Sequence, residues 1–125
     1  MDAKTVIIIE DSEIIADLIK KFITDKFGYV VKWFDSAEAY FKQLVRGDLV
    51  FLDFYLDSKN RNAMNGLDFL KKMNEYDLHI PVITISGITD KRIIEELRKH
   101  KIVNFIDKDA PEFWNRLENE VRTNL

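Results

Sequence analysis

Five short apolar runs, each followed by a longer segment of mixed polarity, constrain the fold more than any other feature of this sequence. The first run, from Thr5 to Ile9, is rich in β-branched residues, which is typical of a strand buried on both faces of a parallel sheet. The pattern predicts strands over residues 5–9, 29–34, 49–52, 81–85 and 102–106.

Helix signals fill the segments between these runs. Ser12 is placed to cap a helix that runs to about Phe27, where Gly28 supplies a stop signal. Asp109 and Glu112 have the spacing of a capping box, which predicts that the last helix opens there and runs to about residue 124. The other helices are expected from Ser36 to near Gly47, from Gly66 to Tyr76 and from Thr89 to His100.

Strands and helices therefore alternate five times, which favours one α/β domain over residues 1–125 with a parallel sheet covered on both faces. Right-handed crossovers limit the topologies. Five strands fit a flavodoxin-like, three-layer (βα)5 fold of strand order 2-1-3-4-5. In that order a ligand crevice opens between the first and third strands, at their carboxyl ends.

Composition excludes several classes of function. Nineteen basic against 22 acidic residues give a net charge of −3, which argues against a strongly basic nucleic-acid binder. The lack of cysteine excludes disulfides, thiolate zinc sites and cysteine nucleophiles. The sequence shows no secretory signal and no apolar run of membrane-spanning length, so we expect a cytoplasmic protein that does not bind membranes.

Three carboxylates stand at the ends of the two strands beside the expected crevice. Glu10 and Asp11 follow the first strand, and Asp53 closes the third. Because these strands flank the crevice, the carboxylates should converge, and the pKa of at least one of them should rise. Hard oxygen ligands of this kind favour Mg²⁺ or Mn²⁺.

A hydroxyl and a cation are expected at the same rim. Ser86 closes the fourth strand, and Lys108 follows the fifth. An ammonium and a hydroxyl can both donate hydrogen bonds to the oxygens of a phosphoryl group. A carboxylate nucleophile, a metal, a cation and a hydroxyl donor are together the equipment for phosphoryl transfer onto an aspartate.

With these residues in place, the chain resembles a response-regulator receiver domain of two-component signalling over essentially its whole length. This family is itself a known example of the 2-1-3-4-5 strand order. The matching positions are Glu10 and Asp11 as the acidic pair, Asp53 as the phosphoacceptor, Ser86 as the hydroxyl, Lys108 as the lysine and Phe105 as the aromatic switch residue.

The resemblance implies a phosphoacceptor switch rather than an enzyme. Asp53 would accept a phosphoryl group from the phosphohistidine of a histidine kinase or a histidine phosphotransfer protein. The Mg²⁺ ion would be bound by Asp11, Asp53 and the backbone carbonyl of Tyr55, with Glu10 acting through water.

The same resemblance implies how the signal leaves the site. Lys108 would pair with the phosphoryl group, Ser86 would move to hydrogen-bond it, and Phe105 would turn inward. The face made by the fourth helix, the fifth strand and the fifth helix would then change its affinity for a downstream protein partner. The chain would act as a monomer or as a phosphorylation-dependent dimer.

One loop departs from the family pattern. Residues 57–65 lack the family's proline and delay the next glycine, Gly66, so that the loop after Asp53 has about five extra residues. It is either a tolerated surface insertion, which we favour, or a partner-specific cover that brings Lys59 or Arg61 near the anion.

A second departure is Asp109, which stands where the family has a proline after the lysine. Because a cis peptide before a residue other than proline costs about 2.5–4 kcal/mol, we expect a trans bond between Lys108 and Asp109. We also expect Asp109 to serve as the cap of the last helix.

Two positions tune hydrolysis of the acyl phosphate in this family. They hold Tyr55, two residues after Asp53, and Ile88, two residues after Ser86. Both side chains are bulky and neither is acidic, so we expect them to shield the acyl phosphate from water and not to orient a water molecule for attack. We therefore expect slow autodephosphorylation.

The expected first helix has a wide apolar face, which spans about half of its circumference. The edge of this face nearest the site consists of Ile14 and Leu18. We expect that edge to stay partly exposed, and it is our hypothesis for the contact with the kinase or phosphotransfer protein. Packing in the core is an equal alternative.

Other side chains have a simpler interpretation. Phe113, Leu117 and Val121 follow a helical period and are expected in the core. The two tryptophans, Trp33 and Trp114, should pack or lie half exposed, and His79 and His100 should be surface residues because their separation does not suit a metal site.

Two other functions stay open at this point. The first is a phosphorylation-independent pseudo-receiver, against which the complete site argues, whereas the long loop and Asp109 argue weakly for it. A haloacid-dehalogenase-type phosphatase also uses an aspartate, Mg²⁺, a hydroxyl and a lysine, but its Asp-x-Asp motif is absent after the first strand. The chain ends soon after the last helix, so we expect output by protein contact and no direct binding of nucleic acid, unless it is an excised domain.

Overall fold

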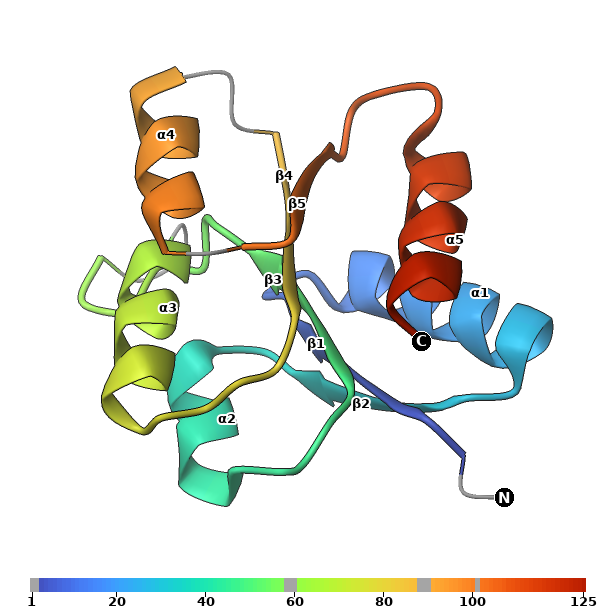
Figure 1. Ribbon diagram of the computed structural model, residues 1–125, viewed down its shortest axis with the longest axis horizontal. Coiled ribbons are helices and arrows are strands. Elements are labelled where there is room, and N and C mark those ends of the chain that lie inside the picture. Colours follow the sequence, from blue (N-terminus) through green and yellow to red (C-terminus); the bar gives the residue numbers. More distant parts are fainter. Residues whose placement is uncertain (1–2, 58–60, 88–90, 101) are drawn as a thin grey trace.

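The computed structural model describes residues 3–57, 61–87, 91–100 and 102–125, in which strands and helices alternate along the chain (Figure 1). The strands are β1 (Thr5–Ile9), β2 (Val30–Phe34), β3 (Leu49–Asp53), β4 (Val82–Ser86) and β5 (Asn104–Asp107). The helices are α1 (Glu13–Phe27), α2 (Ala37–Gln43), α3 (Gly66–Glu75), α4 (Lys91–Lys99) and α5 (Phe113–Asn124).

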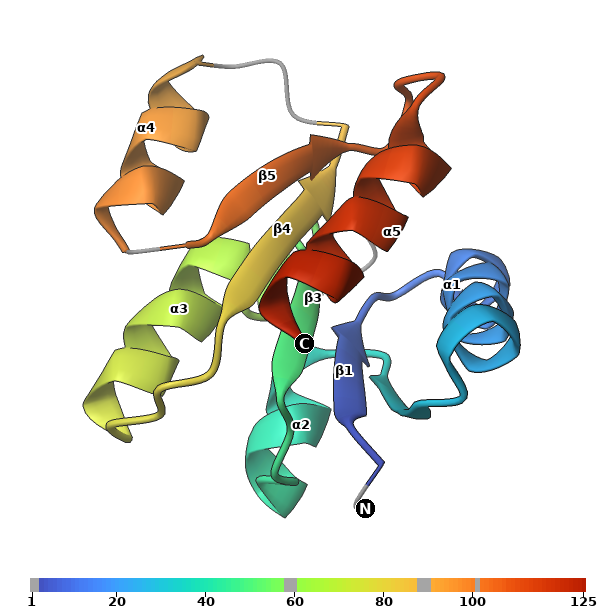
Figure 2. The ribbon, with the colours of Figure 1, turned by 45° about the vertical axis from the view of Figure 1, so that its right-hand side comes forward.

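The strands form one parallel sheet of order β2-β1-β3-β4-β5, which confirms the predicted topology. Helices α1 and α5 cover one face of the sheet, and α2, α3 and α4 cover the other (Figures 1 and 2). Every residue of β3 and β4 is buried, as expected for strands at the centre of a three-layer fold.

Alternate side chains of the central strands enter two separate cores. Ile7, Ile9, Val50 and Leu52 pack with α2, α3 and α4. On the other face, the predicted apolar stripe of α5 (Phe113, Leu117 and Val121) packs with the opposite side chains of β1 and β3 and with α1. The two-residue period of a strand thus distributes one continuous apolar run between both layers.

Local signals set most of the helix ends. Ser12 Oγ accepts a hydrogen bond from the N–H of Ile15 at 3.4 Å, and Gly28 ends α1 with a φ of 68°, both as predicted. Helix α2 ends earlier than expected, because Leu44 takes a left-handed conformation (φ 48°) and its N–H donates to the Tyr40 carbonyl.

The predicted start of the last helix is wrong. Helix α5 begins at Phe113, and no side chain caps it. Asp109 lies instead in a turn, where its N–H donates to Asp107 Oδ1 at 2.9 Å. The physical reason is Pro111, because a residue that precedes proline, here Ala110, is pushed out of the helical region.

The remaining bounds lie within about two residues of the prediction. The predicted start of the fourth helix at Thr89 falls outside the described residues. No helix in the described ranges is both long enough and apolar enough to span a membrane.

Phe51 tests the assignment of the core, because its side chain in β3 is completely buried. We expect Phe51→Ala to lower the free energy of unfolding by about 3–5 kcal/mol, measured by urea denaturation. Val30 on the edge strand β2 is 41% exposed, and Val30→Ala should change it by less than about 0.5 kcal/mol. Equal losses in the two variants would contradict the burial pattern.

Candidate functional site

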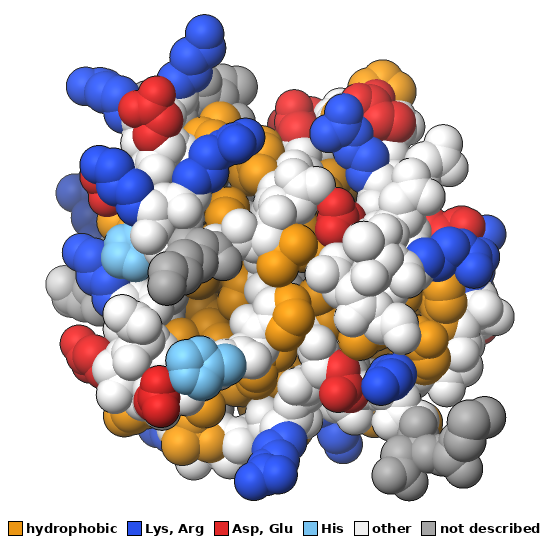
Figure 3. All heavy atoms as spheres, in the orientation of Figure 1, with side chains coloured by type: hydrophobic (Ala, Val, Ile, Leu, Met, Phe, Trp, Pro, Cys, Tyr) orange, Lys and Arg blue, Asp and Glu red, His pale blue; other side chains and the backbone are white. Residues whose placement is uncertain are grey.

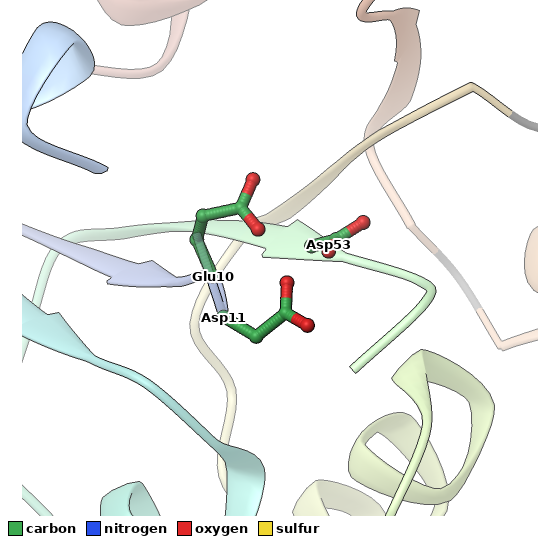
Figure 4. A group of neighbouring side chains, drawn as sticks. All are labelled: Glu10, Asp11 and Asp53. Atoms are coloured by element: carbon green, nitrogen blue, oxygen red, sulfur yellow. The ribbon is translucent and has the colours of Figure 1, made fainter. Parts of the chain in front are cut away.

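Three carboxylates converge at the carboxyl ends of β1 and β3, as predicted. One ligand oxygen from each of Glu10, Asp11 and Asp53 lies within 4.8 Å of the others (Figure 4). The two strands are adjacent and in register, with Ile9 opposite Leu52, so the residues that follow leave the sheet side by side. Glu10 and Asp53 are buried, and Asp11 is half-buried.

Lys108 enters this cluster from the turn after β5. Its ammonium donates to Glu10 Oε1 and lies 3.5 Å from Asp53 Oδ1. The backbone N–H of Lys108 donates to the carbonyl of Ser86 at 3.2 Å, which ties the end of β5 to the end of β4. The lysine therefore lies at the predicted rim, and there it is a cation shared by two buried carboxylates, a contact that the sequence did not predict.

Ser86 has no exposed surface, and its Oγ has no hydrogen-bond partner in the part of the chain that the structure describes. A buried hydroxyl without a partner is uncommon, because its lost hydration is not replaced. The hydroxyl at the end of β4 thus has unused hydrogen-bonding capacity, at the same edge of the sheet as Asp53.

The backbone after Asp53 is held close to its carboxylate. The N–H of Tyr55 donates to Asp53 Oδ1 at 3.3 Å. The N–H of Gly66 donates to the Phe54 carbonyl at 2.8 Å, and a Cβ at position 66 would lie only 2.8 Å from Phe54 Cα. Glycine therefore allows α3 to begin directly against the segment that follows the phosphoacceptor candidate.

The pKa of Glu10 shows how the buried charges of the cluster affect one another. Burial raises the pKa of its carboxyl to about 7, and the charge of Asp53 also raises that pKa, whereas Lys108 opposes both effects. This confirms the prediction that gathering the carboxylates raises at least one pKa.

The donor set fits a small, hard divalent cation. Glu10, Asp11 and Asp53 form the one group of three metal-ligating side chains found within the described ranges. Carboxylate oxygens are the ligands that Mg²⁺ and Mn²⁺ prefer, and a dication would offset both the burial and the repulsion from Asp53 that raise the pKa of Glu10. The backbone carbonyl of Tyr55, which was predicted as a further ligand, belongs to the segment next to Asp53.

The remaining predicted residues lie around this centre. Phe105 is half-buried in β5 and packs against the core beneath α2, α3 and α4. Tyr55 is 41% exposed, and Ile88 falls outside the described residues. Ile14 and Leu18 are 74% and 52% exposed, so the alternative that they pack in the core is wrong.

The two departures from the family pattern have separate outcomes. The Lys108–Asp109 bond is trans, as predicted. Arg61 is exposed, and Lys59 falls outside the described residues, so the idea that either meets the anion stays a prediction. The far end of the loop is tied to α2, since the N–H of Met64 donates to Glu38 Oε2 at 3.0 Å.

Trp33 contacts the site in a way that the sequence did not reveal. Its indole Nε1 donates to the backbone carbonyl of Glu10 at 2.7 Å. Nothing in the spacing of the two residues signals this bond, because it depends on how β2 lies beside β1. The predicted surface position of the histidines holds, since His79 is exposed and His100 is partly exposed.

The comparisons with known proteins agree with this geometry. A family model described as the response regulator receiver domain matches residues 6–119, and the chain belongs to this family. As a receiver domain, it is a signalling module of two-component systems rather than a catalytic enzyme, which confirms the resemblance seen in the sequence.

Among curated proteins, the chain is similar to the transcriptional regulatory protein FixJ of Rhizobium meliloti (strain 1021), with 30% identity over 106 residues. It is also similar to the transcriptional regulatory protein MalR of Bacillus subtilis (strain 168), with 24% identity over 106 residues. These matches cover 83% and 82% of this chain but 49% and 43% of the relatives. The chain thus spans about half the length of the curated relatives that it matches.

Solved structures show the same fold. A CheY-like response regulator receiver domain protein from Methanospirillum hungatei JF-1 superposes with a TM-score of 0.83 at 18% identity, over 98% of this chain and 93% of that one. The phosphorylated cyanobacterial phytochrome response regulator RcpA superposes with a TM-score of 0.80 at 18% identity, over 98% and 94% of the two chains.

The raised pKa of Glu10 predicts how stability depends on pH without a divalent cation. Between pH 4.5 and about 7 the folded state keeps a proton that the unfolded state releases, so the free energy of unfolding falls as the pH rises through this window. Glu10→Gln should remove this part of the decrease, measured by thermal unfolding in a chelator. Glu95→Gln on the exposed side of α4 should retain it, and an unchanged slope in Glu10→Gln would contradict the assignment.

Proposed function

We propose that this receiver domain is a phosphorylation switch in which Asp53 accepts a phosphoryl group from a phosphohistidine. The donor is a histidine kinase or a histidine phosphotransfer protein. The observation that supports this most is the meeting of Asp53 with Glu10, Asp11 and Lys108 at one edge of the sheet. Four charged groups of this kind are the parts that phosphoryl transfer onto a carboxylate requires.

The transfer uses groups that already face one another. A carboxylate oxygen of Asp53 bonds to phosphorus as the bond from phosphorus to the donor imidazole nitrogen breaks, and the imidazole leaves with that electron pair. Lys108, 3.5 Å from Asp53 Oδ1, offers its charge to the phosphoryl oxygens. The buried hydroxyl of Ser86 gains a partner when it donates to one of these oxygens.

Residues of this chain would also hold the cation. Asp11, Asp53 and the backbone carbonyl of Tyr55 would bind Mg²⁺ or Mn²⁺, with Glu10 acting through water. When bound, the cation supplies positive charge that neutralises the phosphoryl oxygens. Asp11 is half-buried whereas Glu10 is buried, so the acidic pair is open to solvent through Asp11.

The output proposed for the switch runs through β4 and β5. Phe105 lies opposite Thr84 in the sheet, two residues before Ser86 on the neighbouring strand. Movement of Ser86 toward the phosphoryl group lets the half-buried ring of Phe105 turn inward. The face made by α4, β5 and α5 then changes its affinity for a downstream protein partner.

The surface of α4 suits a protein partner. Figure 3 shows Lys and Arg side chains gathered over α4, with acidic side chains among them. The net charge of −3 supports output by protein contact rather than by direct binding of nucleic acid. We further propose a cytoplasmic location and a monomer, or a dimer formed on phosphorylation.

The donor would dock beside α1. A groove of about 350 Å³ between α1 and α5 is lined by Leu18, Lys108, Pro111 and Trp114 among others, so it leads from an exposed apolar surface to the lysine of the site. Ile14 and Leu18 stand on the same helix and are more exposed than a core stripe requires. We propose that these two side chains contact the kinase or the phosphotransfer protein.

Phosphorylation by a small donor tests the function directly. Acetyl phosphate with Mg²⁺ should add one phosphoryl group to the wild type, measured by intact mass, and none to Asp53→Asn or to samples without Mg²⁺. Asp57→Asn, which changes an acid in the following loop, should still be modified. Absence of the adduct with Mg²⁺ binding intact would favour a pseudo-receiver, and turnover of a small phosphomonoester would favour a phosphatase.

The docking surface is tested by comparing two donors. Ile14→Ala should slow transfer from the cognate phosphohistidine protein by about five- to tenfold, because truncation of a buried interface side chain weakens binding. Its modification by acetyl phosphate should not change. Val30→Ala, at the opposite end of the sheet, is the matched control. If the protein donor phosphorylated Ile14→Ala as fast as the wild type, the proposal that Ile14 contacts the donor would be contradicted.

The lifetime of the phosphorylated state tests the role of Tyr55. We expect slow loss of the phosphoryl group, because bulky residues at positions 55 and 88 would shield it from the water that attacks it. Tyr55→Asn should accelerate the loss, followed by intact mass over time. Tyr76→Asn changes an exposed tyrosine at the end of α3 and should not. A wild-type lifetime as short as that of fast chemotaxis-type receivers would contradict this prediction.

A further inference from the structure

The indole of Trp33 holds the backbone of the acidic pair. Trp33 belongs to the edge strand β2, and its Nε1 donates to the carbonyl oxygen of Glu10 at 2.7 Å. This distance is at the short end of the range for N–H···O bonds, so the bond is well formed. It joins β2 to the peptide that links Glu10 to Asp11.

The same peptide segment is fixed on its other sides. The N–H of Glu10 donates to the Phe34 carbonyl at 3.1 Å, again from β2. The N–H of Ser12 donates to Glu10 Oε2 at 3.2 Å. The carbonyl oxygen of the Glu10–Asp11 peptide is therefore bound by Trp33, whereas the N–H groups of Glu10 and Ser12 donate to other acceptors.

The orientation of the indole is itself restrained by packing. The ring of Trp33 is half-buried and packs against the core between the sheet and α1. A tryptophan side chain has few rotatable bonds and a single N–H donor, so a packed indole ring holds its hydrogen bond in one direction. The indole is thus a rigid support rather than a flexible contact.

The direction of the Asp11 side chain depends on this support. The bond from Trp33 to the Glu10 carbonyl restrains the ψ angle of Glu10, and a change in that angle alone would turn the Asp11 backbone, and with it the Asp11 Cα–Cβ bond, relative to Asp53. The three carboxylates would then lose the spacing of 4.8 Å or less that suits one cation. Groups that orient metal ligands affect affinity nearly as much as the ligands do.

We propose that Trp33 is a positioning residue for divalent-cation binding, because its indole N–H fixes the Glu10–Asp11 peptide so that the acidic pair faces Asp53. This inference rests on the proposed function, since it concerns the same site. It assigns a role in that site to a residue of the edge strand that touches neither the cation nor the phosphoryl group.

Two substitutions separate the hydrogen bond from the packing of the ring. Trp33→Phe removes the N–H and part of the ring. Replacement of Trp33 alone by 3-benzothienylalanine keeps the size and shape of the ring but puts sulfur in place of the N–H. Both variants should bind Mg²⁺ about tenfold more weakly than the wild type by isothermal titration calorimetry, and Mg²⁺ should raise their melting temperature less.

Val31→Ala is the matched control for loss of stability. Val31 is a buried neighbour in β2 that lies opposite Val6, four residues before Glu10, so its truncation should lower the melting temperature and leave the affinity for Mg²⁺ unchanged. Wild-type affinity in the benzothienyl variant would show that only packing matters and would overturn the inference. A wild-type protein with no measurable affinity for Mg²⁺ would overturn the proposed function and this inference with it.

Discussion

The ion pair between buried Glu10 and Lys108, shared with Asp53, is the interaction on which the rest of the site depends. Two adjacent buried carboxylates are strongly destabilising unless a cation is within reach. Lys108 supplies that cation from the turn after β5, whereas Glu10 follows β1. The pair therefore links the ends of strands that are separated by β3 and β4 in the sheet.

The same arrangement makes the site responsive to a ligand. Lys108 only partly offsets the burial of Glu10, because the pKa of that carboxyl stays raised. The hydroxyl of Ser86 is buried without a partner in the described ranges. In the proposed cycle, a cation takes over the neutralisation of the carboxylates, the phosphoryl group becomes a new partner of Lys108, and Ser86 gains the partner that it lacks. The free state of the site is thus incompletely satisfied, which favours binding.

Much of the fold and of the site could be predicted from the sequence, and the failures have physical causes. The apolar runs predicted the five strands, and the known flavodoxin-like order that they fit gave the order 2-1-3-4-5. The meeting of Glu10, Asp11 and Asp53 then followed from their places at strand ends. The cap assigned to Asp109 failed because the spacing of a capping box ignores the effect of Pro111 on the residue before it.

The sequence by itself determined which segments form strands and which residues stand at their ends, because burial and side-chain period are local properties of the chain. Only the tertiary structure decided that Lys108 reaches Glu10, that the Trp33 indole holds the Glu10 carbonyl and that Ile14 stays exposed. Each of these depends on how elements distant in sequence pack together, and no local pattern encodes the distance between two side chains on different strands.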